Sequence, residues 1–126
     1  MKKETFFTEK APAVIGPYSQ AVKLGELLFV SGQLAFDKET GQLIEGGIQE
    51  QTRKVLENAK IILDEAGSSL EKVVKTTIFL TDLDNFGKVN DVYGEYFPDN
   101  FPARSCVQVA ALPKGAPVEI EFIASL

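Results

Sequence analysis

The sequence predicts an α+β domain in which two helices cover the same face of a single mixed β-sheet. Short stretches with a two-residue alternation or with β-branched side chains are typical of strands, whereas two longer stretches repeat apolar residues every three or four positions, as helices do. The resulting order of elements is β-β-β-α-β-α-β-β. Helices that connect strands of one sheet pack across it in right-handed crossovers, and this places both helices on one face.

The first part of the chain carries three predicted strands, joined by one long loop and one short turn. Residues 11–20 contain two prolines and a glycine, so they predict an ordered loop without regular structure. Gly25 and Glu26 separate the second strand from the third, and a two-residue link that starts with glycine suits a type II′ hairpin. The three strands are predicted at residues 5–8, 21–24 and 27–33.

The central part of the chain alternates helix, strand and helix. Apolar residues recur at steps of three and four over residues 48–66, and Gly67 directly after them is a typical helix-ending residue. Residues 73–80 are rich in β-branched and aromatic side chains, which predicts a strand. Helical spacing returns over residues 83–97, with the threonine or the aspartate at residues 81–82 as the expected N-cap.

Two strands predicted at residues 103–110 and 118–124 complete the sheet, with a turn containing proline and glycine between them. Side chains alternate between the two faces of a strand, so each strand presents two distinct rows. In the last strand, Glu119 and Glu121 lie opposite a fully apolar row made of Val118, Ile120 and Phe122. In the strand before it, one face is shared by Arg104, Cys106 and Gln108.

We expect Arg104 and Cys106 to lie with Glu119 and Glu121 on the sheet face that the helices leave uncovered. Such a face mixes polar side chains with large apolar neighbours. In a small protein, an uncovered and partly apolar sheet face favours packing against further copies of the chain.

Length and composition limit the possible functions. A chain of 126 residues is expected to form one domain, residues 1–126, with a core of its own. The net charge of −5 and the pI near 4.8 argue against a nucleic-acid binder, which would need a basic face. The single cysteine and the lack of a signal peptide or of an apolar stretch of about 18 residues are typical of a cytoplasmic protein without a membrane segment.

The chain contains no histidine. A Ser-His-Asp triad, a Cys-His pair and a typical zinc site are therefore excluded, and no metal is expected. In any reaction, proton transfer must depend on a carboxylate, a tyrosine, a lysine or the single cysteine.

Arg104 and Glu119 are the main candidates for chemistry. A guanidinium offers a planar donor fork for a carboxylate or a phosphate, although a surface or interface salt bridge is the more common role of such an arginine. Glu119 lies between apolar residues in a strand expected to be central. A carboxylate there must pair with Arg104 or a lysine, or take a raised pKa that suits a general base. Cys106 has no base to activate its thiol and is expected to be a small buried apolar residue.

Further candidate binding residues lie on a loop, at a strand end and within a helix. Tyr18 belongs to the proline-containing loop, and binding residues concentrate on such loops. Ser31 and Gly32 end a strand in a way that lets a ligand approach the main chain closely. Asn90 occupies a helix interior, a position that asparagine disfavours unless its side chain has a partner.

Three stretches of sequence, taken together, identify a family resemblance. They are APAVIGPYSQA at residues 11–21, FVSGQ at residues 29–33, and PARSCV from residue 102 with VEIE at residues 118–121. In this order and at these separations they strongly resemble the Rid family, the YjgF-like reactive intermediate deaminases once called translation inhibitors. The resemblance extends from about residue 5 to residue 126.

The resemblance implies a homotrimer with a chorismate-mutase-like α+β fold, whose sheets line a central barrel and whose active sites lie in clefts between subunits. It also implies a 2-iminobutanoate/2-iminopropanoate deaminase. Such an enzyme uses an activated water, without metal or cofactor, to hydrolyse the imine forms of 2-aminoacrylate and 2-aminocrotonate to 2-oxo acids and ammonia.

Carried over to this chain, the resemblance implies that Arg104 binds the substrate carboxylate and that Glu119 holds and polarises the attacking water. The main chain of Cys106 would hold the substrate nitrogen or the water, and Tyr18 would reach the pocket from across the subunit boundary. The residues expected to line the pocket are Tyr18, Ser31, Gly32 and Asn90.

Two functions of other classes remain as alternatives. One is a regulatory trimer that binds 2-oxo acids without turnover. The other is an endoribonuclease or translation inhibitor, a name attached to some relatives. The acidic charge and the lack of histidine argue against RNA cleavage.

Overall fold

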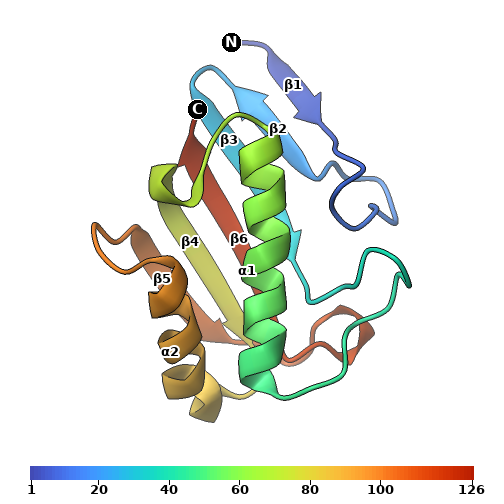
Figure 1. Ribbon diagram of the computed structural model, residues 1–126, viewed down its shortest axis with the longest axis vertical. Coiled ribbons are helices and arrows are strands. Elements are labelled where there is room, and N and C mark those ends of the chain that lie inside the picture. Colours follow the sequence, from blue (N-terminus) through green and yellow to red (C-terminus); the bar gives the residue numbers. More distant parts are fainter.

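The computed structural model describes residues 1–126 and shows a six-stranded sheet with both long helices on one of its faces (Figure 1). The strand order is β1-β2-β3-β6-β4-β5, and only the β4–β5 pair is parallel. The predicted order of elements, the mixed sheet and the α+β class are confirmed. The elements are β1 (Lys3–Phe6), β2 (Ala21–Leu24), β3 (Leu27–Gln33), α1 (Ile48–Glu65), β4 (Val73–Leu80), α2 (Phe86–Tyr96), β5 (Ala103–Gln108) and β6 (Val118–Ser125).

The first strand was expected at residues 5–8, and this is wrong by two residues, because it runs from Lys3 to Phe6. Thr8 cannot join the strand ladder, since its main chain is bonded to a side chain. Its N–H donates to Gln20 Oε1 at 2.7 Å, and its carbonyl accepts from Gln20 Nε2 at 3.1 Å. The strand expected at residues 103–110 is also shorter and ends at Gln108.

The expected hairpin between β2 and β3 is present. Leu24 pairs with Leu27, which leaves Gly25 and Glu26 as the two-residue link. Gly25 has a φ of +59°, while Glu26 is not among the residues with positive φ. This combination is that of a type II′ turn, whose first central position favours glycine.

The helix α1 ends as the sequence predicts. The N–H of Ser68 donates to the carbonyl of Leu63 at 2.8 Å, and the N–H of Gly67 donates to that of Asp64 at 3.2 Å. These are the two hydrogen bonds of a Schellman motif, and Gly67 provides the left-handed residue with a φ of +88°. The motif turns the chain from the helix toward β4.

A short 3₁₀ helix, η2 (Leu83–Asn85), leads into α2, and Asp82 caps it by accepting a hydrogen bond from the N–H of Asp84 at 2.9 Å. Of the two expected caps, Asp82 is therefore the one used. Three polar contacts tie α2 to α1, and one of them is donated by the Gln49 amide to the carbonyl of Lys88 at 3.2 Å. The Tyr96 hydroxyl donates to Glu57 at 2.6 Å, and Arg53 pairs with Glu95 at 2.7 Å.

The core lies between the two helices and the covered face of the sheet (Figure 1). The central strand β6 contributes four buried side chains to it, and α1 contributes a stripe with helical spacing. Burying a side chain such as Phe122 stabilises the fold by about 1.5–3 kcal/mol. No helix combines the length and the apolar character needed to cross a membrane.

The expectation that Arg104 and Cys106 share the uncovered face with Glu119 is wrong. Cys106 pairs with Ile78 of β4, and Ile78 also pairs with Ile120 of β6. Side chains of directly paired residues point to the same face, so Cys106 and Arg104 lie on the side of the helices. Arg104 is exposed and Cys106 is only partly buried there, because β5 is an edge strand at the margin of the helix layer.

The uncovered face carries Glu119 and Glu121 from β6, as expected, and side chains from its neighbours. Val107 of β5 and Phe29 of β3 are large apolar residues on this face, exposed to 44% and 38%. Exposed apolar side chains on an uncovered sheet face favour association with another protein surface.

Two glycines allow a matched test of whether the left-handed backbone at the end of α1 requires glycine. Gly67→Ala places a side chain at a φ of +88° and is expected to lower the free energy of unfolding by about 1–2 kcal/mol. Gly87 lies within α2 without a positive φ, and a Cβ atom there would meet no neighbouring atom. Gly87→Ala is therefore expected to raise the free energy of unfolding by about 0.5–1 kcal/mol. Urea denaturation measures both, and equal effects of the two substitutions would contradict the assignment of Gly67.

Candidate functional site

Two separate hollows are lined by all of the candidate residues except Cys106. The first, which we call the Glu119 hollow, has a volume of about 580 Å³. It lies between the loop before β2, the end of β3, the start of β6 and the turn η3 (Pro113–Gly115). Among its lining residues are Pro12, Ile15, Tyr18, Ser31, Gly32, Leu34, Phe36, Lys114, Glu119 and Glu121.

The loop that carries Tyr18 is held by hydrogen bonds to buried groups. The amide of Gln20, only 3% exposed, bonds to both main-chain groups of Thr8 and donates to the carbonyl of Pro12 at 3.1 Å. The Ser31 hydroxyl donates to the carbonyl of Ser19 at 2.6 Å. The loop is thereby fixed on both sides of Tyr18, whose side chain remains 54% exposed at the wall of the hollow.

Gly32 lies beside Glu119 for a steric reason. Ser31 and Gly32 form a bulge in β3, where two residues face one residue of β6. A Cβ atom on Gly32 would lie 2.7 Å from the carboxyl carbon of Glu119. The space that Gly32 leaves open is taken by the Glu119 side chain, whereas the expected approach of a ligand to the main chain at this position stays a prediction.

Glu119 is half-buried and has no cationic partner within the chain. None of the four ion pairs includes it, so the expected alternative, pairing with Arg104 or a lysine, is not found. Burial raises the pKa of the Glu119 carboxyl above its usual value, and the negative charge of Glu121 raises it further. A carboxyl whose pKa is raised in this way suits a role in proton transfer.

The second hollow, which we call the Arg104 hollow, has a volume of about 350 Å³ and lies between α2 and the start of β5. The Arg104 guanidinium donates to Asn90 Oδ1 at 2.7 Å. Its central carbon lies 4.9 Å from the ring centroid of Tyr93 and 5.3 Å from that of Phe86. The lining residues are Asn90, Tyr93, Gly94, Phe97, Phe101, Pro102 and Arg104.

The surroundings of Arg104 come from one stripe of α2. Phe86, Asn90 and Tyr93 are spaced i, i+4 and i+7, so they lie on the same face of the helix. Asn90 therefore has the partner that its place in the helix suggested. The two aromatic contacts were not predicted from the sequence, because Phe86 and Tyr93 also fit the pattern of a core stripe. Their spacing around Asn90 was the available signal.

Cys106 lies on β5, two residues after Arg104 and on the same face. Burial raises the pKa of its thiol above the usual value, while the positive charge of Arg104 acts in the opposite direction. The net shift favours the neutral thiol, which agrees with the expected lack of a nucleophilic role.

The seven candidate residues thus divide into two groups within one chain. The two hollows share no lining residue. The group at the Glu119 hollow comprises Tyr18, Ser31, Gly32 and Glu119. The group on the side of α2 comprises Asn90, Arg104 and Cys106.

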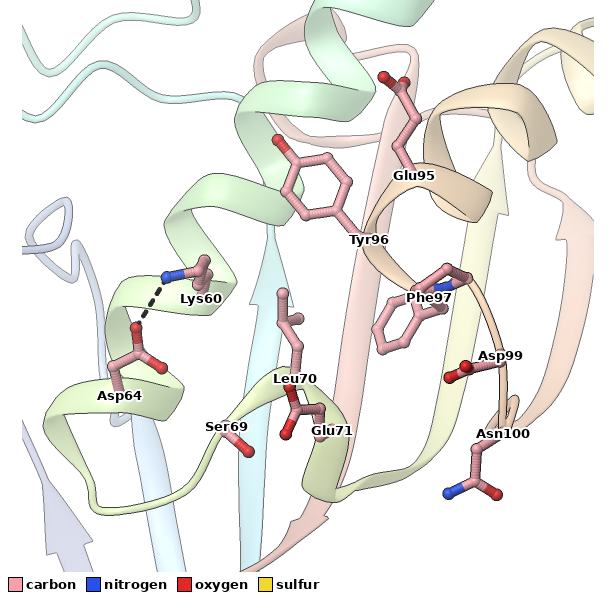
Figure 2. Close-up of a pocket in the computed structure, with 11 residues that line it drawn as sticks. Lys60, Asp64, Ser69, Leu70, Glu71, Glu95, Tyr96, Phe97, Asp99 and Asn100 are labelled. Carbon is pink, nitrogen blue, oxygen red and sulfur yellow. Dashed lines mark hydrogen bonds and ion pairs between the residues drawn. The ribbon is translucent and has the colours of Figure 1, made fainter.

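A third hollow, of about 500 Å³, lies on the helix side and contains none of the candidate residues. Figure 2 shows that it is bordered by α1 and by the end of α2, with Tyr96 and Phe97 projecting from the latter. Lys60 pairs with Asp64 at 3.0 Å, and three further carboxylates line the hollow. This negative charge disfavours an anionic ligand.

No group of three or more histidine, cysteine, aspartate or glutamate side chains is arranged to hold a metal ion.

Comparisons with known proteins identify the family and the fold of the chain. The family described as Endoribonuclease L-PSP matches residues 8–126. A RutC family protein of Pyrococcus abyssi is 56% identical over 98% of each chain. The human 2-iminobutanoate/2-iminopropanoate deaminase is 50% identical over 93% of this chain and 85% of its own.

Among solved structures, a Rid family protein of Yersinia pestis is 50% identical, with a TM-score of 0.96 over 99% of this chain and all of that one. E. coli TdcF, solved with bound serine, is 44% identical, with a TM-score of 0.92 over 98% of both chains. The whole chain therefore has the fold of these proteins.

Removing the charge of Glu121 tests the electrostatics of Glu119. Because Glu121 raises the pKa of Glu119, Glu121→Gln is expected to lower that pKa, yet to leave it above the usual value, since burial remains. A pH titration of the carboxyl carbons by NMR measures the change. As a control, Glu4→Gln on the exposed strand β1 should leave the pKa of Glu119 unchanged. An unchanged pKa in Glu121→Gln would contradict the proposed coupling.

Proposed function

Because the chain belongs to the Endoribonuclease L-PSP family, which includes the Rid proteins, we propose that it is a 2-iminobutanoate/2-iminopropanoate deaminase. One observation carries the proposal. A single chain presents a half-buried carboxyl without a partner, Glu119, and a guanidinium with unused donors, Arg104. Hydrolysis of a 2-imino acid needs a group that moves the protons of water and a group that binds the carboxylate.

The two groups are proposed to act together at the boundary between two copies of the chain. Within one chain they lie in separate hollows, on opposite faces of the sheet. The exposed apolar residues of the uncovered face, Phe29 and Val107, support packing against another copy. In the proposed homotrimer the sheets line a central barrel, and the Arg104 hollow of one copy faces the Glu119 hollow of the next.

Arg104 is proposed to bind the substrate carboxylate through two parallel hydrogen bonds. A guanidinium has five N–H donors, and only one of them is used within the chain, by Asn90. Such charge-assisted bidentate hydrogen bonds fix both the position and the orientation of the substrate.

The remaining candidates are proposed to complete the pocket. Tyr18 and Ser31 line it from the neighbouring copy, beside Gly32, while Asn90 accompanies Arg104. The main chain of Cys106 holds the substrate nitrogen or the water. This role is open to it because β5 is an edge strand, so a row of its main-chain groups is not paired by a neighbouring strand of the chain.

The reaction requires no covalent nucleophile, because an imine carbon is already electrophilic. The oxygen of a water held by Glu119 bonds to C2 while the C=N electron pair moves to the nitrogen. Glu119 accepts a proton from the water and delivers it to that nitrogen. Glu119 then accepts the hydroxyl proton of the tetrahedral intermediate as C=O forms and passes it to the nitrogen as the C–N bond breaks, which releases ammonia and the 2-oxo acid.

A coupled assay tests this function. A serine dehydratase generates 2-aminoacrylate, and the protein is expected to accelerate the appearance of pyruvate in proportion to its concentration. Binding of 2-oxobutanoate without any acceleration would instead support a regulatory trimer. Degradation of RNA by the same preparation, with no effect on pyruvate, would support the endoribonuclease function and overturn the proposal.

Substitution of Arg104 tests the fork contact. Arg104→Ala is expected to lower kcat/KM by roughly 30- to 1,000-fold, and Arg104→Lys by nearly as much, because an ammonium cannot form two parallel hydrogen bonds. If Arg104 served only in a salt bridge, lysine would restore most of the turnover and alanine would mainly lower the melting temperature. Near-normal turnover in a stable Arg104→Ala protein would exclude the assignment.

Mixing two inactive variants tests the shared site. Arg104→Ala and Glu119→Gln chains are refolded together, so that intact halves from different copies meet in about one quarter of the sites of a random trimer. Activity is expected to return to about that fraction, and light scattering should show three chains of 13.8 kDa each per particle. If both residues acted from the same chain, mixing would restore no activity.

A further inference from the structure

The guanidinium of Arg104 is held by two aromatic rings, and its hydrogen bond alone would not fix its plane. One contact from a guanidinium nitrogen to Asn90 still permits rotation about that contact. The rings of Tyr93 and Phe86, at 4.9 and 5.3 Å from the guanidinium carbon, restrict this rotation. A carboxylate is bound by two parallel hydrogen bonds only if the guanidinium plane has the right orientation.

Of the two rings, that of Tyr93 is the more firmly fixed. Tyr93 is 6% exposed, and its hydroxyl forms a buried hydrogen bond of 2.8 Å with the hydroxyl of Thr76. Thr76 lies on β4, directly opposite Arg104 in the strand ladder. The ring of Phe97 packs against that of Tyr93 at 4.7 Å between centroids.

These contacts connect Arg104 to the sheet by two routes. One is its own strand, β5, and the other runs through the Tyr93 ring and the Thr76 hydroxyl to the neighbouring strand. The position of the guanidinium relative to its own backbone is thereby limited at both ends of the side chain.

We propose that Tyr93, fixed by Thr76, is a positioning residue that sets the plane of the Arg104 guanidinium for carboxylate recognition. The inference rests on the proposed function, since it concerns the carboxylate that Arg104 binds there. Tyr93 acts through Arg104 and touches no reacting atom. Its effect is therefore specific to ligands that carry a carboxylate.

The experiment compares the product 2-oxobutanoate with its amide, 2-oxobutanamide, which has nearly the same shape but carries no negative charge. Calorimetry on the assembled wild-type protein gives the ratio of their affinities. Tyr93→Leu removes the ring. It is expected to weaken the binding of 2-oxobutanoate about 10-fold and to leave the affinity for 2-oxobutanamide unchanged. In turnover, KM for the imine should rise with little change in kcat, because the lost contact acts on the ground state and the transition state alike.

A conservative variant and a matched control separate positioning from a purely structural role. Tyr93→Phe keeps the ring, so it should retain most of the preference for the acid. Tyr96→Leu is the same substitution one turn further along α2, where the hydroxyl bonds to Glu57 and not to the surroundings of Arg104. It should lower stability and leave the affinity ratio intact.

Phe86→Leu provides a second route if Tyr93→Leu fails to assemble, because Phe86 is 37% exposed and is less important for packing. It should reduce the affinity ratio in the same direction. An unchanged ratio in Tyr93→Leu, or in Phe86→Leu if the former does not assemble, overturns the inference, as does an equal loss in Tyr96→Leu.

The outcome for the wild type separates this inference from the proposed function. A wild-type protein that prefers 2-oxobutanoate and hydrolyses the imine, with an unchanged ratio in the variants, would refute only the role of Tyr93. A wild-type protein that shows neither preference nor hydrolysis would refute the proposed function and the inference together.

Discussion

The alternation of side chains along the central strand β6 is the constraint on which the rest of the structure depends. Its buried row, which includes Val118, Ile120 and Phe122, forms the floor of the core beneath α1. A strand has only two faces, so the residues between them, Glu119 and Glu121, must point away from the core. The same backbone therefore fixes the apolar packing and the position of the carboxyl. A shift of one residue in register would expose the core row and bury both glutamates.

The two functional groups are held by different means. Glu119 lies on β6, a strand paired on both sides, and a bulge with a glycine in β3 provides the space for its side chain. Arg104 lies on an edge strand and depends on α2, which in turn is tied to α1 through Tyr96 and Glu57. The position of the guanidinium is therefore linked to the packing of the helices, whereas the position of the carboxyl is linked to the sheet.

The chemistry of the proposed site follows from what the chain lacks as well as from what it contains. Without histidine, the proton transfer falls to a carboxyl whose pKa is raised by burial and by a neighbouring negative charge. Placing Glu119 beside Glu121 in a half-buried position opposes ionisation, and this is a cost to the folded chain that no cation within the chain offsets. Unpartnered groups of this kind concentrate at functional sites, where a ligand or another subunit supplies the partner.

The sequence by itself determined the number, type and order of the elements, because the periods of two and of three to four residues are local properties of the chain. It also identified Asn90 and Gly32 as unusual, since a helix interior disfavours one and a strand interior the other. Only the tertiary structure decided on which face of the sheet Arg104 lies. That face depends on the pairing of β5 with β4, and strands joined through a helix carry no turn that sets their register. For the same reason the contacts of Arg104 with Tyr93 and Phe86 emerged only when α2 was placed against the sheet.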